Sequence, residues 1–242
     1  MNITFIGTGD AFGSGGRMNT CFYVETPVVN FLVDCGAGTL SGLKKHQIVP
    51  EHIDAILISH FHGDHYGGVP YFLLDAAIGQ RKKELTIISP PGGKEKLTQL
   101  LTLLYPGTEV LEKLDLYFVE YQPFEEVIIG KLYLHAFPVI HNEASLPHGL
   151  RIKVADQILS YSGDTEWTDN LIQLCEDADL FICECNFFNL KVKGHFNYTE
   201  LLEKRDELNC KKIVLTHFGT EMLNNLEHVS LDCAFDGLKL EI

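Results

Sequence analysis

The sequence predicts an α/β (α+β) fold in which two β-sheets pack face to face and helices cover their outer faces. Short apolar runs rich in β-branched and aromatic residues, typical of strands, occur in both halves of the chain. Segments with a helical pattern of apolar residues lie between these runs. No linker, low-complexity stretch or clear internal repeat interrupts the 242 residues, so we expect residues 1–242 to form a single domain.

The first half of the chain begins with closely spaced strands and continues with strands and helices. The early strands are separated by Gly-rich or Pro-containing turns, which favours an antiparallel sheet. Asp54–Ser59 is almost continuously apolar, as expected of a strand that is buried on both faces. The strands predicted in this half are Ile3–Gly7, Cys21–Glu25, Val29–Asp34, Asp54–Ser59 and Leu85–Ser89, and the helices are Gly36–Gln47, Gly67–Ala77 and Lys94–Tyr105.

The second half repeats this pattern. Leu150–Ser160 contains eleven residues, enough for one tight hairpin with its turn at Ala155-Asp156-Gln157. Lys212–Thr216 is expected to be the final buried strand. The strands predicted here are Val127–Ile129, Lys131–Phe137, Leu150–Val154, Ile158–Ser162, Asp179–Cys185 and Lys212–Thr216, and the helices are Thr168–Glu176 and Tyr198–Leu208.

Composition limits the classes of partner. The formal net charge is -14, and a field of this sign repels a polyanion such as tRNA or DNA unless a local basic patch overrides it. A small substrate is therefore favoured over a nucleic acid. We find no signal peptide and no apolar run near the ~20 residues that span a bilayer, so a soluble, cytoplasmic protein without a membrane partner is expected. The seven scattered cysteines are expected to be reduced.

The most informative segment reads Ser-His-Phe-His-Gly-Asp-His from position 59, directly after a buried strand. Imidazole and carboxylate groups together suit Zn, Mn or Fe. In extended backbone, His60 and His62 share one face and can chelate one ion. We expect the intervening Gly63 to let the chain turn, so that Asp64 and His65 face a second ion.

This segment resembles the His-x-His-x-Asp-His signature of the metallo-β-lactamase superfamily, and the likeness extends over nearly the whole chain. Phe31–Gly36 resembles the early strand and turn of that family. Tyr161–Thr165 resembles its bridging-aspartate segment, and Leu215–Phe218 resembles its last ligand segment. The resemblance implies a four-layer αβ/βα sandwich of two mixed sheets flanked by helices.

The resemblance also implies a cofactor of two divalent metal ions, with zinc as the first choice and manganese or iron as alternatives. It assigns His60, His62 and His141 to the first ion, Asp64, His65 and His217 to the second, and Asp164 as the bridge between them. The three ligands outside the signature each follow a predicted strand.

Within the superfamily, the chain resembles the ribonuclease Z and phosphodiesterase branch. The third ligand lies in Val139–Glu143 rather than in the Gly-His-Thr-Pro-Gly-like segment of the glyoxalase and lactonase types. Gly7–Phe12 and Asp34–Thr39 also resemble segments of this branch. Ribonuclease Z carries a tRNA-gripping arm before the bridging aspartate, where this chain has only Leu150–Ser160. The chain is thus expected to lack the arm. Homodimers are common in this branch, which makes a homodimer a further expectation.

That branch carries a catalytic histidine that is paired with a glutamate. Asp179–Glu184 resembles the strand with the glutamate, and His195 stands where the branch has His-Ser-Thr, although Phe196 departs from that pattern. We therefore expect Glu184 to orient His195, and Asp64 to belong to the catalytic centre. The alternative is that His195 is an exposed loop histidine. His148 follows the third ligand and either reaches a substrate phosphate or is exposed.

These residues predict a dinuclear metal-dependent hydrolase, a phosphodiesterase of small cyclic phosphodiesters that acts through a metal-bridging hydroxide. One alternative is another ester class on the same site, namely a lactone, thioester or β-lactam. Others are tRNA 3′-processing and a non-enzymatic metal-binding or ligand-binding protein. His46, His52, His135 and His228 match no pattern and are expected to be structural or at the surface.

Overall fold

The computed structural model describes residues 1–242, which form two seven-stranded β-sheets. In spatial order, the first sheet contains β14 (Lys239–Glu241), β1 (Asn2–Gly7), β2 (Cys21–Glu25), β3 (Phe31–Val33), β4 (Ala55–Leu57), β5 (Leu85–Ser89) and β6 (Leu116–Glu120). The second sheet contains β13 (Asp232–Cys233), β12 (Ile213–Thr216), β11 (Leu180–Glu184), β10 (Gln157–Tyr161), β9 (His148–Val154), β8 (Leu132–Pro138) and β7 (Glu126–Ile129).

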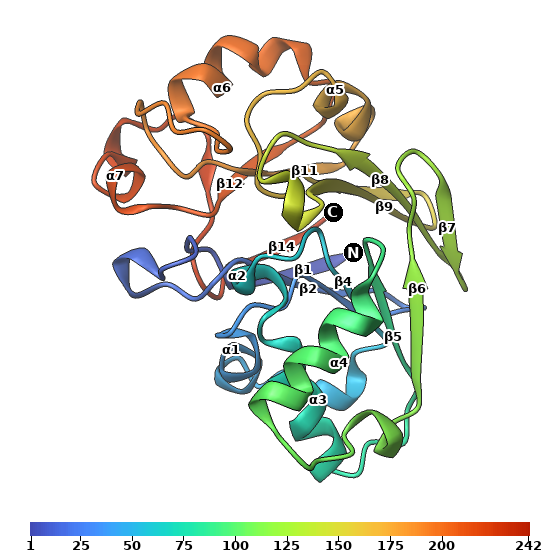
Figure 1. Ribbon diagram of the computed structural model, residues 1–242. Helices are drawn as coiled ribbons and strands as arrows, with labels where there is room; N and C mark the ends of the chain where they lie inside the picture. Colours follow the sequence, from blue (N-terminus) through green and yellow to red (C-terminus); the bar gives the residue numbers. More distant parts are fainter.

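The α-helices cover the outer faces of the two sheets. They are α1 (Thr39–Lys45), α2 (Gly63–Tyr66), α3 (Val69–Ile78), α4 (Gly93–Leu104), α5 (Asn170–Cys175), α6 (Tyr198–Lys204) and α7 (Thr220–Leu223). Short 3₁₀ helices occur at Ser14–Gly16, Pro50–His52, Leu111–Lys113, Glu143–Ser145, Arg205–Glu207 and Leu226–His228. In Figure 1, α1, α3 and α4 lie outside the first sheet, and α5, α6 and α7 lie on the side of the second. The expected four-layer αβ/βα sandwich is confirmed. No helix is both long and apolar enough to cross a bilayer.

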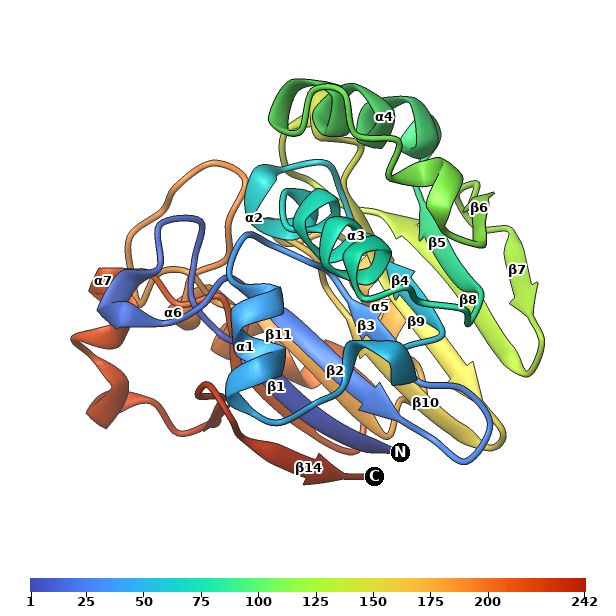
Figure 2. The same cartoon turned by 90° about the horizontal axis from the view of Figure 1, so that it is seen from below.

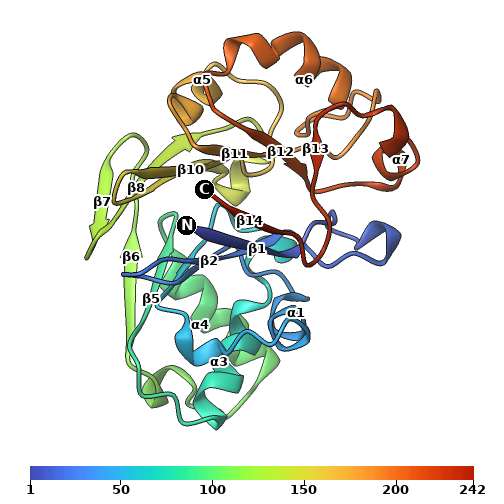
Figure 3. The same ribbon diagram turned by 180° about the vertical axis from the view of Figure 1, so that it is seen from behind.

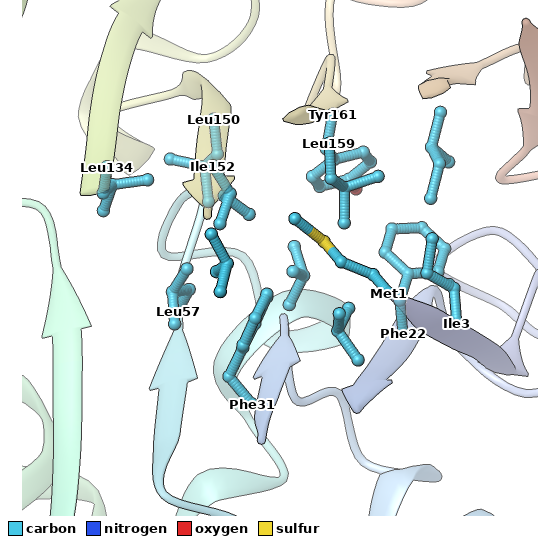
Figure 4. Close-up of a cluster of buried hydrophobic side chains, with 14 of the residues drawn as sticks. Met1, Ile3, Phe22, Phe31, Leu57, Leu134, Leu150, Ile152, Leu159 and Tyr161 are labelled. Carbon is cyan, nitrogen blue, oxygen red and sulfur yellow. The ribbon is translucent and has the colours of Figure 1, made fainter. Parts of the chain in front are cut away.

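A hydrophobic core fills the space between the sheets. Its 23 buried residues come from both halves of the chain. In Figure 4, Phe31 and Leu57 of the first sheet face Leu150 and Ile152 of the second. The ring of Phe22 packs edge-on against Tyr161 across this interface, with ring centroids 5.1 Å apart. This shared core fixes the relative position of the two sheets and of the loops at their ends. The single-domain organisation stays a prediction.

The strand directions agree with the expected mixed sheet. β1, β2 and β3 pair antiparallel as predicted, and β3, β4, β5 and β6 pair parallel. The helices between these later strands return the chain to the same edge, which is the connection that a parallel pair requires. The prediction missed the edge strand β6. Lys212–Thr216, observed as β12, is the final buried strand as predicted. The short strands β13 and β14, which contain no buried residue and were not predicted, follow it, and β14 pairs with β1 (Figure 3).

The expected tight hairpin is confirmed. β9 and β10 pair antiparallel, with Val154 opposite Gln157, so only Ala155 and Asp156 form the turn. Ala155 adopts a left-handed φ of 53°. No additional segment is inserted at this point of the chain.

Several strands end at the same edge of the molecule. β10, β11 and β12 are parallel, so their carboxyl ends meet there. β8 runs in the same direction as β10, because each pairs antiparallel with β9. Loops after parallel strands are the usual place for a functional site in such sheets.

Candidate metal centre and substrate cleft

The structure brings together all seven residues that the sequence singled out as candidate ligands. One group contains His60, His62, His141 and Asp164, and the other contains Asp64, His65, Asp164 and His217. Within each group, one potential ligand atom per residue lies within 4.8 Å of all the others. These spacings suit one cation per group, with Asp164 common to both.

Asp164 lies between the two groups. Its Oδ2 atom is 3.3 Å from Nε2 of both His65 and His217, and 3.9 Å from Nε2 of both His60 and His141. Its Oδ1 atom is buried without a hydrogen-bond partner. Burial raises the pKa of Asp164, but the neighbouring imidazoles, His217 first, outweigh this effect and hold the pKa well below its usual value. The side chain is thus a carboxylate in the position of a bridge.

The backbone after His62 turns as expected, but the conformational freedom of Gly63 is not the cause. His62 is extended, with φ −85° and ψ 150°, as predicted. The turn that follows is the short helix α2, which begins at Gly63. A Cβ atom at Gly63 would meet no atom within 4 Å, and its φ is not in the left-handed region. The turn therefore comes from helix formation and does not depend on glycine.

Two buried hydrogen bonds to Asp34 set the protonation of His65 and His60. Oδ2 of Asp34 is 2.7 Å from Nδ1 of His65 and accepts a hydrogen bond of 2.8 Å from the Ser59 hydroxyl. A carboxylate only accepts, so Nδ1 of His65 carries the proton. The only proton of the Ser59 hydroxyl goes to Asp34, so the Ser59 oxygen accepts from Nδ1 of His60, 3.0 Å away. Nε2 of His60 is left with a lone pair. Nε2 of His65 faces the carboxylates of Asp64 and Asp164; burial lowers the pKa of His65, but these carboxylates outweigh burial and raise the pKa well above its usual value.

His141 and His217 are held in the same way. Nδ1 of His141 donates to the Gly194 carbonyl at 2.7 Å. The Thr20 hydroxyl donates to the Gly9 carbonyl and therefore accepts from Nδ1 of His217, both at 3.0 Å. Nε2 of each ring then carries a lone pair, and in His141 this atom lies 3.0 Å from Nδ1 of His62. Such partners on the far nitrogen are typical of metal-binding histidines.

The local chemistry fits a cation in each group. Nε2 of His60 and Nε2 of His65 are buried without a hydrogen-bond partner. Nε2 of His65 lies 3.0 Å from Oδ2 of Asp64, a contact that is favourable when a proton or a metal cation lies between the two atoms. Burial, reinforced by the neighbouring His65, lowers the pKa of His60 well below its usual value, which favours the neutral imidazole that binds metals.

Two glycines after strands allow the chain to approach this centre closely. Gly163 precedes Asp164 and has φ 62°, and a Cβ atom there would lie 2.5 Å from the His148 carbonyl oxygen. Gly194 has φ 87°, and its Cβ would lie 2.7 Å from Nδ1 of His141. Larger residues at either position would be strained and would displace the site.

The structure pairs Glu184 with His195. Nδ1 of His195 is 3.0 Å from Oε1 of the fully buried Glu184, whose carboxylate also accepts hydrogen bonds from the backbone N–H groups of Thr165 and Asn186. The His195 side chain is 20% exposed, so it is not a freely exposed loop histidine. Burial lowers the pKa of His195, but the charge and hydrogen bond of Glu184 outweigh this effect and raise it to about 9.

A cleft of about 580 Å³ opens over both groups. His62, Asp64, His141, Asp164, His195 and His217 line its floor and walls, together with Asp10, Ala11, Phe12, Ser14, Asn186, Phe187, Val192, Gly219, Thr220 and Glu221. The lining contains no lysine or arginine. Lys193 lines an adjoining hollow on the other side of His141.

The remaining histidines lie outside the cleft. His148 is not exposed, because it is buried, donates from Nδ1 to the Leu146 carbonyl at 2.8 Å and packs edge-on against Tyr121; its contact with a substrate phosphate stays a prediction. His52 and His228 are exposed, and His135 lies on the outer face of β8.

Sequence reasoning gave no role to Asp34, Ser59, Thr20 or Phe12. Asp34, Ser59 and Phe12 lie within segments whose family resemblance was noted, and a polar residue directly before a ligand histidine is a signal that could have indicated Ser59. Thr20 contacts His217 across 197 positions of the chain, a proximity that only the fold creates.

Comparisons with known proteins agree with the fold and the branch. The family model described as "Anti-Pycsar protein Apyc1" matches residues 1–233. The chain is 32% identical to the anti-Pycsar protein Apyc1 of Bacillus phage BSP38, over 91% of this chain and 90% of that protein. It is 28% identical to ribonuclease Z of Methanothermobacter thermautotrophicus, over 91% and 87% of the two chains. The crystal structure of the metallo-β-lactamase fold protein YhfI from Bacillus subtilis superposes with a TM-score of 0.81 at 23% identity, covering 100% and 98%.

Proposed function

The chain belongs to the family described as anti-Pycsar protein Apyc1, and from this premise we propose that it is a dinuclear metal-dependent phosphodiesterase that hydrolyses cyclic nucleotides. The chain is a hydrolase of the metallo-β-lactamase fold, related to ribonuclease Z and YhfI. The observation that carries the finer proposal is the pair of ligand groups that share Asp164 at the floor of a cleft without lysine or arginine.

Two divalent ions, with zinc as the first choice, are the proposed cofactors. His60, His62 and His141 would hold the first ion, and Asp64, His65 and His217 the second, with Asp164 between them. Five imidazoles and two carboxylates make a nitrogen and oxygen donor set that also suits manganese or iron. When bound, such ions lower the pKa of a shared water and neutralise charge that develops on the phosphate.

In the proposed reaction, side chains of the protein orient the catalytic histidine and supply a proton to the leaving group. Glu184 fixes His195 by accepting from Nδ1, which leaves Nε2 free to act on substrate. The His195 ring lies beside both groups, with centroids 4.8 Å from His141 and 5.7 Å from His217. A pKa of about 9 keeps His195 protonated at neutral pH, and metal cations bound in the two groups would lower this pKa toward the range of an efficient general acid. His195 is therefore the group that we propose to protonate the leaving alkoxide.

The negative charge of the cleft and of the whole chain favours a small diester over RNA as the substrate. Asp10 and Glu221 line the cleft, and the net charge of the chain is -14. A phosphodiester carries one negative charge, which the two cations neutralise, whereas further phosphates of an RNA would face carboxylates without a basic partner in this cleft. The β9–β10 turn of two residues also leaves no arm with which to grip tRNA.

A substrate screen on the metal-loaded protein tests the proposal. Protein reconstituted separately with Zn and Mn is offered 3′,5′-cyclic nucleotides, bis(p-nitrophenyl) phosphate, a tRNA precursor and a lactone panel. We expect metal-dependent turnover of the cyclic nucleotides and of the synthetic diester. Preferred turnover of the tRNA precursor or of a lactone would overturn the proposal, and two bound metals with no turnover would favour a binding protein. The cytoplasmic location and the homodimer stay predictions.

A further inference from the structure

One of the aromatic side chains that line the cleft is unusually exposed to solvent. Phe12 lines the cleft with the candidate ligands, yet it is 93% exposed, the most exposed of the large apolar side chains. Several other phenylalanines, such as Phe5 and Phe22, are fully buried. Leaving an aromatic ring in water forgoes the stabilisation that burial gives. An aromatic ring kept in this position beside a cleft is suited to contact with a ligand.

The loop that carries Phe12 is held by a network of hydrogen bonds. The carboxylate of Asp10 accepts from the backbone N–H groups of Phe12 at 3.1 Å and Ser14 at 2.9 Å, and from the Ser14 hydroxyl at 2.7 Å. The Asn19 amide donates to the carbonyls of Asp10 and Ala11. These bonds fix the backbone on both sides of the ring.

The loop is also fixed against a neighbouring helix. The Thr220 hydroxyl at the start of α7 donates to the Ser14 hydroxyl at 3.2 Å. Figure 2 shows the segment with the Ser14–Gly16 turn lying beside α7 at the edge of the molecule. Phe12 is thus presented over the cleft by a defined local structure.

The cleft offers further apolar surface near the metal groups. Phe187 lines it, and the Phe187 ring centroid is 6.3 Å from that of His195. Val192 is 39% exposed in the same lining. A substrate with its phosphate on the metal groups extends a non-phosphate part along these side chains. In the absence of lysine and arginine, the part that fits an exposed aromatic face is flat and uncharged, as a nucleobase is.

We propose that Phe12 stacks on the nucleobase of the cyclic nucleotide and is a specificity-determining residue of this cleft. This inference rests on the proposed phosphodiesterase function and adds the recognition of the base to it. Stacking on an aromatic face tolerates different bases, because every base has a π-face. Phe12 therefore selects diesters that carry a base over diesters that lack one, with little preference between purine and pyrimidine.

The test compares substrates with and without a base. Metal-loaded wild-type, Phe12→Ala and Phe12→Tyr proteins are assayed on cyclic AMP, cyclic UMP and ribose 3′,5′-cyclic phosphate. In Phe12→Ala, kcat/KM for both nucleotides is expected to fall relative to the base-free compound by about 5-fold to about 150-fold, mainly through KM. Phe12→Tyr retains an aromatic face and is expected to restore the selectivity. Leu103→Ala on α4, which removes a 77% exposed apolar side chain outside the cleft lining, is the matched control.

Several results would overturn the inference. An equal loss of kcat/KM on all three compounds would make Phe12 a support for the loop or the metal groups. A change of oligomeric state in Phe12→Ala, measured by light scattering, together with such a loss would make Phe12 an interface residue.

Calorimetric binding of cyclic AMP separates this inference from the proposed function. A wild-type protein that binds cyclic AMP without hydrolysing it would refute the phosphodiesterase, and weaker binding by Phe12→Ala would still support stacking. Equal affinity of the two proteins, or no binding by either, would refute stacking.

Discussion

Replacing Asp34 by asparagine should impair the metal centre although Asp34 is not one of its candidate ligands. The carboxylate accepts from the Ser59 N–H and hydroxyl groups at 2.8 Å and lies 2.7 Å from Nδ1 of His65. An amide has one oxygen, so its NH₂ group must face one of these donors. If NH₂ replaces Oδ2, the Ser59 hydroxyl accepts from it and donates to His60. The proton of His60 then moves to Nε2, the nitrogen that we assign to the metal.

The opposite orientation of the amide is also unfavourable. If NH₂ replaces Oδ1, the buried backbone N–H of Ser59 loses its acceptor, which costs about 1–3 kcal/mol. Losing the outer partner of a metal-bound histidine typically lowers metal affinity by about 10-fold to 100-fold. Since the change affects the surroundings of both His60 and His65, we expect a fall of at least about 10-fold in affinity and about 1–3 kcal/mol in the free energy of unfolding of the metal-free protein.

Competition with a chromophoric chelator measures the affinity, and urea unfolding measures the stability. Asp75→Asn is the matched control, because Asp75 pairs at the surface with Lys44 at 2.6 Å and exposed pairs contribute only about 0–1 kcal/mol. Metal affinity within about twofold of wild type in Asp34→Asn, with unchanged stability, would refute the assignment of these proton positions.

Three further changes test other parts of the site. His195→Ala should lower kcat by about 10²-fold to 10⁴-fold while elemental analysis still finds both metals, because His195 supplies a proton and is not assigned as a ligand; metal loss would make it structural. Thr20→Val removes the hydroxyl that accepts from Nδ1 of His217 at 3.0 Å. This variant should release the more weakly held metal at about 10-fold lower chelator concentration than wild type, whereas Thr20→Ser should behave like wild type. Equal release by Thr20→Val and wild type would count against this role of Thr20. Removing the metals with EDTA should lower the melting temperature measured by calorimetry. An ion that binds only the folded chain adds about 4 kcal/mol to the free energy of unfolding when its concentration is 1,000 times its Kd. Identical melting temperatures with and without zinc would argue against a metal site in the folded chain.

The sequence alone predicts the candidate metal centre because its signals are local. The His-rich segment directly follows an apolar strand, and His141, Asp164 and His217 each come shortly after a predicted strand. Strands of a layered α/β fold end at a common edge, so these positions converge without any knowledge of the loops between them. The buried strands of both sheets were predicted for the same reason, since a continuous apolar run does not depend on its neighbours.

The features that sequence reasoning missed depend on the tertiary structure. β6 is a half-exposed edge strand, and β13 and β14 are so short that their pairing partners define them. Mixed sheets were predicted, but which strands pair parallel follows from the packing of the helices and not from any strand's own pattern. The proton positions on His60 and His65 depend on Asp34, which is 31 positions from His65. The exposure of Phe12 could not be predicted either, because an aromatic residue in a loop is more often buried.

The most direct test of the central claim is the fate of a 3′,5′-cyclic nucleotide followed by ³¹P NMR. The apo protein, the protein loaded with zinc or manganese, and loaded Asp164→Ala are compared at equal concentration. We predict that the cyclic diester signal converts to that of a nucleoside monophosphate only with the loaded wild-type protein. A cyclic diester that persists beside wild-type protein carrying two metals, or one that is hydrolysed equally by the apo protein, would contradict the proposed dinuclear phosphodiesterase.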